Sequence, residues 1–302
     1  MSNPSSATFR VGDEAFRLRY PATGIDISRM LPPLVPFLSP NGASPLFTVT
    51  LLPPKSHADS PARPAAVATI ADFTWDAGSC RIEALDFEQD HHRITLHPYQ
   101  SDTRYTIACS DHFAQAELRM QDNGCDAFVL NNLLMMLYAF CTAPQQRLLM
   151  HASVIACAGK GYLFLGKSGT GKSTHSRLWL DYVAGSELLN DDNPVVGISH
   201  GEVTVYGSPW SGKTPCYKNR KLPVGAFVRL EQAPVNAIRR EGAARAFASL
   251  LPSCSCLHQD QGVSAGVVST VKRIAAQTPV YHLQCLPDAD AVFLAHQTIT
   301  HP

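Results

Sequence analysis

The sequence has no excess of charge of either sign: its 302 residues include 25 Lys and Arg and 25 Asp and Glu. Without a global basic field it offers no electrostatic reason to bind nucleic acid, and without an acidic tail it indicates no basic partner. It also lacks a signal peptide, because its first eight residues are small and polar rather than basic and then apolar. We therefore expect a cytoplasmic protein that does not bind nucleic acid.

The sequence also lacks a long uninterrupted apolar run and a cysteine framework. Its longest apolar stretch, residues 128–143, contains Asn131 and Asn132 and is shorter than the ~20 residues that span a bilayer. Nine cysteines are too few for a disulfide scaffold at this length, and the close pair Cys254 and Cys256 has neither zinc nor redox spacing. We expect a buried helix, no membrane span, and thiols in a reducing compartment.

What the first part of the chain does contain is a series of short β-forming runs. A hydrophobic content of 45% supports a proper core. The runs are separated by short clusters of Gly, Asp, Ser or His, which is typical of an antiparallel meander. We predict a smaller β-rich accessory domain over residues 1–125, with strands over 67–75, 80–87, 92–98, 104–109 and 112–120.

The pattern changes after residue 125. A helix over residues 131–142 leads into strands that alternate with helices, which indicates an α/β layer structure over residues 126–302. The predicted strands are 148–156, 162–165, 187–190, 195–198, 202–207, 225–231 and 280–286. The predicted helices are 172–183, 241–251, 265–277 and 288–298.

The most specific motif is the phosphate-loop pattern G-x-x-x-x-G-K-[ST]. It follows an apolar β-like run, residues 162–165, and opens a predicted helix, whose N-terminus favours anions. Backbone N–H groups of such a loop converge on phosphate oxygens, the lysine neutralises the outer phosphates, and the hydroxyl suits Mg²⁺. The alternative, an ordinary glycine-rich turn, does not explain all four fixed positions. The loop consists of Gly166, Lys167, Ser168, Gly169, Thr170, Gly171, Lys172, Ser173 and Thr174.

Two adjacent carboxylates follow one helix later. Asp191 and Asp192 come directly after the predicted strand 187–190, about 20 residues beyond Lys172. A phosphate loop needs an acidic group for the metal, and a kinase needs one that accepts the substrate proton. The alternative is a solvated Asp-Asp-Asn-Pro turn. His151 heads the strand before the loop strand, and it is either a core histidine or part of the same site.

Three segments occur together in this order: His151-Ala-Ser-Val-Ile, the loop 166–174, and Leu-Leu-Asn-Asp-Asp at 188–192. Together they resemble the HPr kinase/phosphorylase family, bacterial enzymes that phosphorylate a seryl residue of a small carrier protein. The loop and the Asp-Asp strand end also look like ATP-dependent phosphoenolpyruvate carboxykinases, which share that nucleotide-binding core. The resemblance covers residues 148–300. It implies an α/β (α+β) fold: a carboxykinase-like P-loop core with a mixed sheet, preceded by the β-rich domain.

The resemblance implies ATP and Mg²⁺ as cofactors and a role for each matching residue. The loop 166–174 would hold the triphosphate, Lys172 the transferring phosphoryl group, and Ser173 the metal. Asp191 and Asp192 would supply a metal ligand and a catalytic base, with the assignment of each left open. His151 would lie beside the phosphates. HPr kinases form hexamers, so a homo-oligomer is compatible with the resemblance, although no residue establishes one.

One segment departs from the family. Where the family carries Glu-x-Arg-Gly, residues 203–213 contain neither that Glu nor that Arg. The resemblance therefore does not extend to the phosphorylase reaction or to the same acceptor protein. Trp210, Ser211 and Lys213 could form a different acceptor surface, or Lys213 could be an ordinary loop lysine.

The sequence thus favours an ATP- and Mg²⁺-dependent kinase that transfers the γ-phosphoryl group to a hydroxyl, with Ser of a protein or peptide as the expected acceptor. Two alternatives stay open: a kinase of small-molecule hydroxyls, and a non-catalytic nucleotide-sensing protein. Carboxykinase chemistry is disfavoured, because the chain is short for that family and has no clear arginine set for oxaloacetate.

Overall fold

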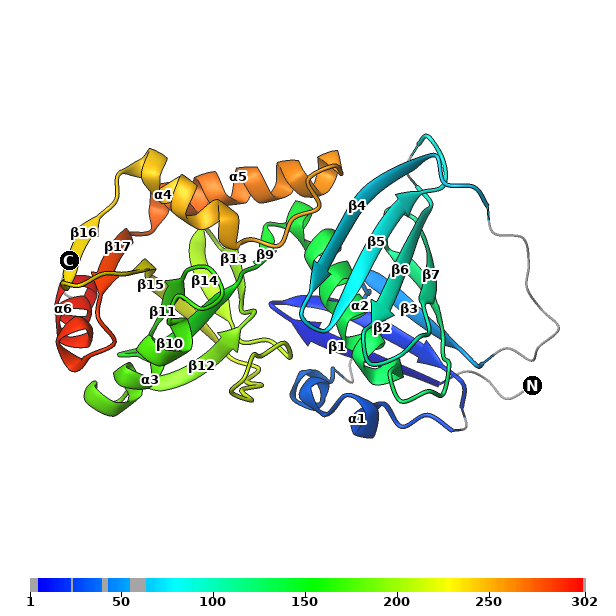
Figure 1. Ribbon diagram of the computed structural model, residues 1–302, viewed down its shortest axis with the longest axis horizontal. Helices are drawn as coiled ribbons and strands as arrows, with labels where there is room; N and C mark the ends of the chain where they lie inside the picture. The colour runs from blue at the N-terminus through cyan, green and yellow to red at the C-terminus, as the bar shows by residue number, and fades with distance from the viewer. Residues whose placement is uncertain (1–4, 23, 40–42, 55–63, 89, 301–302) are drawn as a thin grey trace. The chain divides into compact units, whose positions relative to one another are not determined.

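The computed structural model describes residues 5–22, 24–39, 43–54, 64–88 and 90–300, and it shows a mixed α/β protein with two sheets (Figure 1). The chain divides into two compact units. The first is Met1–Thr142 with Leu257–Ser264, and the second is Ala143–Cys256 with Ala265–Pro302. The sequence predicted a domain boundary after residue 125. In the structure, the helix at 126–142 belongs to the first unit, because its apolar residues are buried in that unit's core.

The first unit contains an eight-stranded sheet in the order β1-β2-β3-β8-β7-β6-β5-β4. The predicted meander is present as β4 to β8, all paired antiparallel. Strands β1 to β3 were not predicted from the sequence. Two of their pairings, β2 with β3 and β3 with β8, are parallel and have no hairpin turn to mark them. The strands are β1 (Ser5–Val11), β2 (Glu14–Tyr20), β3 (Phe47–Leu52), β4 (Ala68–Trp75), β5 (Gly78–Ala84), β6 (His92–Pro98), β7 (Tyr105–Ser110) and β8 (Gln115–Arg119).

Helix α2 (Asp126–Thr142) fills the core of this unit. It contacts β3 and β6, and the Tyr138 hydroxyl donates a hydrogen bond to the Val11 carbonyl at 2.8 Å. Alternate residues of β6 are buried, as expected for a strand with one face against a helix. Two shorter helices, α1 (Ile27–Met30) and the 3-10 helix η1 (Pro32–Phe37), complete the unit.

The apolar helical stretch is longer than the sequence indicated. With the 3-10 helix η2 (Ala143–Gln145), α2 forms a 20-residue helical stretch that is long and apolar enough to cross a membrane. More than half of that stretch is buried inside the protein. A buried core helix of a soluble protein has the same length and composition, so the stretch does not distinguish the two.

The second unit contains a nine-stranded mixed sheet in the order β12-β10-β11-β15-β14-β13-β9, with β17 paired to both β15 and β16. The predicted strand 148–156 is two strands, β9 and β10, because Met150 and His151 leave the sheet to pair with the segment at 253–254. The strands are β9 (Arg147–Leu149), β10 (Ala152–Cys157), β11 (Lys160–Leu165), β12 (Glu187–Asp192), β13 (Val195–Ser199), β14 (Glu202–Tyr206), β15 (Lys221–Gln232), β16 (Ala237–Arg240) and β17 (Val280–Cys285).

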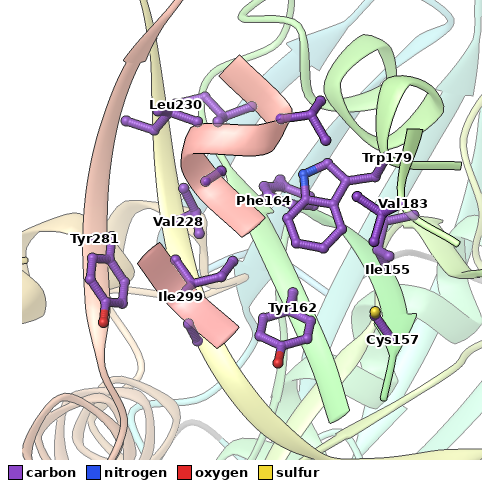
Figure 2. Close-up of a cluster of buried hydrophobic side chains, with 14 residues drawn as sticks. Ile155, Cys157, Tyr162, Phe164, Trp179, Val183, Val228, Leu230, Tyr281 and Ile299 are labelled. Atoms are coloured by element: carbon purple, nitrogen blue, oxygen red, sulfur yellow. The ribbon is translucent and has the colours of Figure 1, made fainter. Parts of the chain in front are cut away.

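Apolar residues of the sheet and of two helices form the core beside the phosphate loop (Figure 2). Trp179 is fully buried, and its ring centroid lies 5.5 Å from that of Phe164 and 5.8 Å from that of Tyr162. This packing fixes the helix that follows the loop against the strand that precedes it. The helices of the unit are α3 (Lys172–Tyr182), α4 (Ala243–Leu250), the 3-10 helix η3 (Leu251–Ser253), α5 (Gln261–Gln277), which begins in the first unit, and α6 (Ala289–Thr300).

Candidate functional site

A cavity of about 710 Å³ in the second unit gathers most of the residues that the sequence singled out. The end of β12, the start of β10, the phosphate loop and the loop after β14 all contribute to it. Because β10 lies between β11 and β12 in the sheet, the loop after β11 and the carboxylates of β12 meet at one edge. The lining residues are His151, Ser153, Ser168, Gly169, Gly171, Lys172, Ser173, Thr174, Arg177, Leu178, Asp191, Asp192, Gly212, Lys213 and Thr214.

The phosphate loop connects β11 directly to α3. Gly171 has φ 104°, a conformation that glycine adopts most readily, and it caps α3 without any side-chain hydrogen bond. Thr170 closes the turn, since its N–H and its hydroxyl both donate to the Lys167 carbonyl, at 3.1 and 2.7 Å. The first N–H groups of α3 therefore have no side-chain cap at the end of the helix where anions are stabilised.

The Lys172 side chain is largely buried and lies along the loop. Its Nζ donates to the carbonyls of Gly166 at 2.9 Å and Lys167 at 3.3 Å, and to Nε2 of His151 at 2.7 Å. Burial lowers the pKa of Lys172, and the charges of Asp192 and Asp191 partly oppose that shift. The ammonium is thus held by neutral acceptors at the position where a phosphate-loop lysine meets the phosphates.

His151 connects this lysine to one carboxylate. Because Lys172 donates to Nε2, a neutral ring carries its proton on Nδ1, which lies 3.0 Å from Oδ1 of Asp192. The side chains of His151 and Asp192 are 41% and 31% exposed, so both are accessible from the cavity. His151 is therefore not a core histidine: it belongs to the candidate site.

Asp191 differs from its neighbour in being almost fully buried, at 5% exposure. Its Oδ1 accepts a hydrogen bond from the Ser153 hydroxyl at 3.1 Å, and Ser153 pairs with Ser176 of α3 at 2.7 Å. Its Oδ2 is buried without a hydrogen-bond partner among the described residues. The alternative of a solvated turn is wrong for Asp191, because the residue lies within β12 and is enclosed by β10 and α3.

The donor atoms at this edge fit a magnesium ion that is shared with a phosphate. Among the described residues, no group of three or more His, Cys, Asp or Glu side chains could hold a metal by itself. Magnesium is commonly held by one or two carboxylates together with substrate phosphates and water. The unpartnered Oδ2 of Asp191, the hydroxyl of Ser173 and the Asp192 carboxylate line one cavity and provide such a partial set.

The segment 210–214 contributes to the cavity in a different way from the sequence-based expectation. Gly212 donates its N–H to the Asp191 carbonyl at 3.0 Å, and a Cβ at this position would lie 2.6 Å from that oxygen. Trp210 is only 3% exposed and so does not form an acceptor surface. Lys213 is an exposed loop lysine that lines the cavity, and the Ser211 hydroxyl donates to the Thr214 carbonyl.

Several polar residues of the site were not predicted from the sequence. Ser153 is a hydroxyl within an otherwise apolar strand, and this mismatch was its only signal. Arg177 lies four residues after Ser173 on α3, so the helical period places both on one face. Thr214 and Ser176 carried no recognisable signal, because their roles depend on contacts between segments distant in sequence.

The comparisons with known proteins identify no family for this chain. No protein-family model matches the sequence, and no curated protein matches it. Among solved structures, the chain is similar to the HPr(Ser) kinase/phosphatase from Coxiella burnetii, with a TM-score of 0.32 and 13% sequence identity. The match covers 50% of this chain and 88% of that chain. A similarity at this level supports no function, so the functional argument depends on the geometry of the site.

Proposed function

We propose that the protein is an ATP- and Mg²⁺-dependent kinase that transfers the γ-phosphoryl group to a hydroxyl, on a P-loop core of the phosphoenolpyruvate carboxykinase type. One observation carries the proposal: the phosphate loop, its lysine and two adjacent carboxylates line a single cavity. Phosphoryl transfer needs mainly positioning and neutralisation of charge, and these residue types supply both.

The loop supplies the phosphate-binding part of the mechanism. The uncapped N–H groups at the start of α3 bind phosphate oxygens. Lys172 already has its ammonium between the loop carbonyls and His151. A bound phosphate replaces those neutral acceptors with a charged one, which strengthens the hydrogen bond.

The two carboxylates have environments that suggest different roles. We assign the metal to Asp191 and Ser173, because Oδ1 of Asp191 is fixed by Ser153 while the buried Oδ2 is left without a protein partner. A bound Mg²⁺ supplies charge that neutralises the β- and γ-phosphates. The serine pair Ser153 and Ser176 holds this carboxylate in one orientation.

Asp192 is the better candidate for the catalytic base. It is more accessible than Asp191, and its Oδ1 lies beside Nδ1 of His151. Asp192 accepts the proton of the acceptor hydroxyl as that oxygen bonds to the γ-phosphorus and the bond to the ADP leaving group breaks. His151 positions Asp192 relative to Lys172, because the ring contacts both.

The acceptor that we propose is a Ser of a protein or peptide, which follows the sequence resemblance. Lys213 and Thr214 lie at the cavity next to Asp192, and both are exposed. A small-molecule hydroxyl is the first alternative, since the same groups could bind a metabolite. The second alternative is a nucleotide-sensing protein that binds ATP without transferring its phosphate.

The test is transfer of a labelled γ-phosphate by the wild-type protein and by Lys172→Ala, against a panel of Ser-containing peptides and hydroxyl metabolites with Mg²⁺. We expect label on one class of acceptor with the wild-type protein and none with the variant. Unchanged transfer in Lys172→Ala would contradict the proposal. ATP binding without transfer to any acceptor would favour the sensing alternative, and label on metabolites alone would favour the small-molecule kinase.

A further inference from the structure

A second cavity, of about 750 Å³, borders the same phosphate loop. Gly169, Gly171 and Thr174 line both cavities, so a ligand on the loop can extend from one into the other. The second cavity contains neither Lys172 nor the two carboxylates, and the proposed transfer reaction makes no use of it. Its lining residues are Gly169, Thr170, Gly171, Thr174, His175, Leu230, Gln232, Ala233, Pro234, Cys285, Leu286 and Pro287.

The topology of the sheet explains why a cavity forms there. Strands β11, β15 and β17 are neighbours and run parallel, so their carboxyl ends meet at one edge. The phosphate loop follows β11, the segment 233–236 follows β15, and the segment 286–288 follows β17. Ligands of α/β proteins bind in crevices outside the carboxyl ends of parallel strands.

Hydrogen bonds between these segments form the walls before any ligand binds. Ala233 donates its N–H to the Cys285 carbonyl at 3.2 Å, and Leu286 donates its N–H to Oδ1 of Asn236 at 2.8 Å. Nδ2 of Asn236 in turn donates to Asp288 at 3.0 Å. The Gln232 amide donates to the carbonyls of Gly169 and Thr170 of the phosphate loop, at 3.3 and 3.4 Å. The two walls are thus joined to each other and to the loop.

The second cavity is lined by uncharged side chains, whereas the first is lined by several charged ones. No charged side chain of the described residues lines it, whereas five charged side chains line the first. Leu230 is buried beneath it, while Leu286 presents an apolar side chain with 39% exposure. Such a surface binds a flat, uncharged group better than it binds a phosphate.

His175 adds one polar group to this cavity. It is 3% exposed, and Trp179 donates its indole N–H to Nε2 at 3.1 Å. Because Trp179 donates to Nε2, a neutral ring carries its proton on Nδ1. His175 is one of the residues that line this cavity. A donor is therefore available to a ligand atom that accepts hydrogen bonds.

We infer that this second cavity binds the base and ribose of a nucleoside triphosphate whose phosphates occupy the loop 166–174. The apolar walls contact the faces of the base, and His175 donates to an acceptor atom of the nucleoside. The inference depends on the nucleotide binding proposed above, and it adds which residues recognise the nucleoside.

The test is isothermal titration of the full-length protein with two ligands in the presence of Mg²⁺: the non-hydrolysable ATP analogue AMP-PNP and inorganic tripolyphosphate. Leu286→Glu places a charge on the apolar wall. Val235→Glu is the matched control, because Val235 is 62% exposed in the segment after β15 and does not line the cavity. We expect Leu286→Glu to weaken AMP-PNP binding by at least about tenfold, because a carboxylate on this wall must either lose its water or keep the base from covering the wall. Tripolyphosphate binding should stay as in the wild type, and Val235→Glu should change neither.

A second variant, Ala233→Trp, fills the cavity without adding charge and should have the same selective effect. Wild-type affinity for AMP-PNP in both variants would overturn the inference and leave the phosphate site intact. Equal loss for AMP-PNP and tripolyphosphate would also overturn it, because the change would then act on the phosphates. If the wild-type protein binds neither ligand, the proposed nucleotide site itself is wrong.

Discussion

The two units of the molecule bury polar side chains in different ways. In the first unit, Asp126 and His92 are not bonded to each other. Asp126 accepts hydrogen bonds from Tyr105 and two backbone N–H groups, and His92 stacks on Phe113 with no partner for either ring nitrogen among the described residues. In the second unit, Ser153, Ser176 and Asp191 are bonded to one another at the edge where the phosphate loop begins.

The difference indicates that buried polar side chains of the first unit contribute to stability, whereas those of the second unit contribute to the candidate site. A buried carboxylate costs free energy unless it is paired or hydrogen-bonded. Asp126 meets that requirement, since Tyr105 and two backbone N–H groups donate to it. Asp191 meets it only in part, because its Oδ2 has no hydrogen-bond partner among the described residues. We therefore expect changes in the first unit to alter stability and changes at this edge to alter activity.

Among changes to the two carboxylates, the largest expected effect comes from Asp192→Asn. The amide cannot accept the proton of the acceptor hydroxyl, so the transfer rate should fall by about 10³-fold, within the range known for loss of a general base. Binding of Mg²⁺ and AMP-PNP should change little, because Asp191 and Ser173 remain. The measurements are labelled γ-phosphate transfer and isothermal titration with the same preparation.

Asp191→Asn is the matched comparison for that prediction. It should raise the Mg²⁺ concentration needed for half-maximal nucleotide binding, because one negative metal ligand is lost. If Asp192→Asn has this metal-dependent effect and Asp191→Asn does not, the two assignments must be exchanged. Equal effects on metal dependence would show that both carboxylates hold the ion.

The second effect is the pH dependence of the second unit through His175. The native pKa of about 4 lies below the ordinary value of 6.5, so between these values the unfolded chain binds a proton that the native ring does not. The unfolding free energy should therefore fall as the pH drops from 6.5 to 4, by up to about 3 kcal/mol for this group. Urea titrations followed by tryptophan fluorescence across this pH range measure it.

His175→Gln provides the control, because glutamine does not titrate and can still accept a hydrogen bond from Trp179. The variant should lose the corresponding part of the acid dependence. If it unfolds with the same pH slope as the wild type, His175 does not contribute. Burial also lowers the pKa of His92, so the first unit should lose stability in the same direction on acidification.

The third prediction concerns the stability of the first unit alone. Asp126→Ala removes a buried carboxylate that accepts bonds from Gln121 N–H, Asp122 N–H and the Tyr105 hydroxyl, so the segment before α2 loses its hydrogen bonds to the start of the helix. We expect a loss of about 2 kcal/mol in unfolding free energy, with transfer activity per folded molecule unchanged. Thermal unfolding with activity assays below the transition checks both. If Asp126→Ala loses transfer activity while it is fully folded, the first unit also affects the site, and the division between stability and activity is wrong.

The sequence predicted the parts of the molecule whose signals are local. The phosphate loop, the strand before it and the helix after it depend on neighbouring residues, as do the hairpins that join β4 to β8. Strand β3 was not predicted, because it pairs in parallel with β2 and β8, and parallel pairing joins segments far apart in sequence without a turn between them. Strands β1 and β2 were not predicted either, although they form an antiparallel hairpin with its turn at Gly12 and Asp13.

The candidate site shows the same limit. Asp191 and Asp192 could be named from the sequence, but the pattern could not assign their roles. That distinction arises from Ser153 on β10 and Ser176 on α3, which enclose one carboxylate and leave the other accessible. The difference between the two carboxylates therefore depends on the order of the strands in the sheet, where β10 lies between β11 and β12.

The smallest expected effect tests the acceptor side of the cavity. Lys213 lines the cavity on an exposed loop, and it has no ion-pair partner among the described residues. Removing its charge in Lys213→Ala should lower the transfer rate about fivefold, which is about 1 kcal/mol, with nucleotide affinity unchanged. Lys218→Ala is the matched control, because that lysine pairs with Glu187 and does not line the cavity. If Lys213→Ala weakens AMP-PNP binding instead, the lysine contacts the donor nucleotide, and the acceptor must be recognised by other residues of this edge.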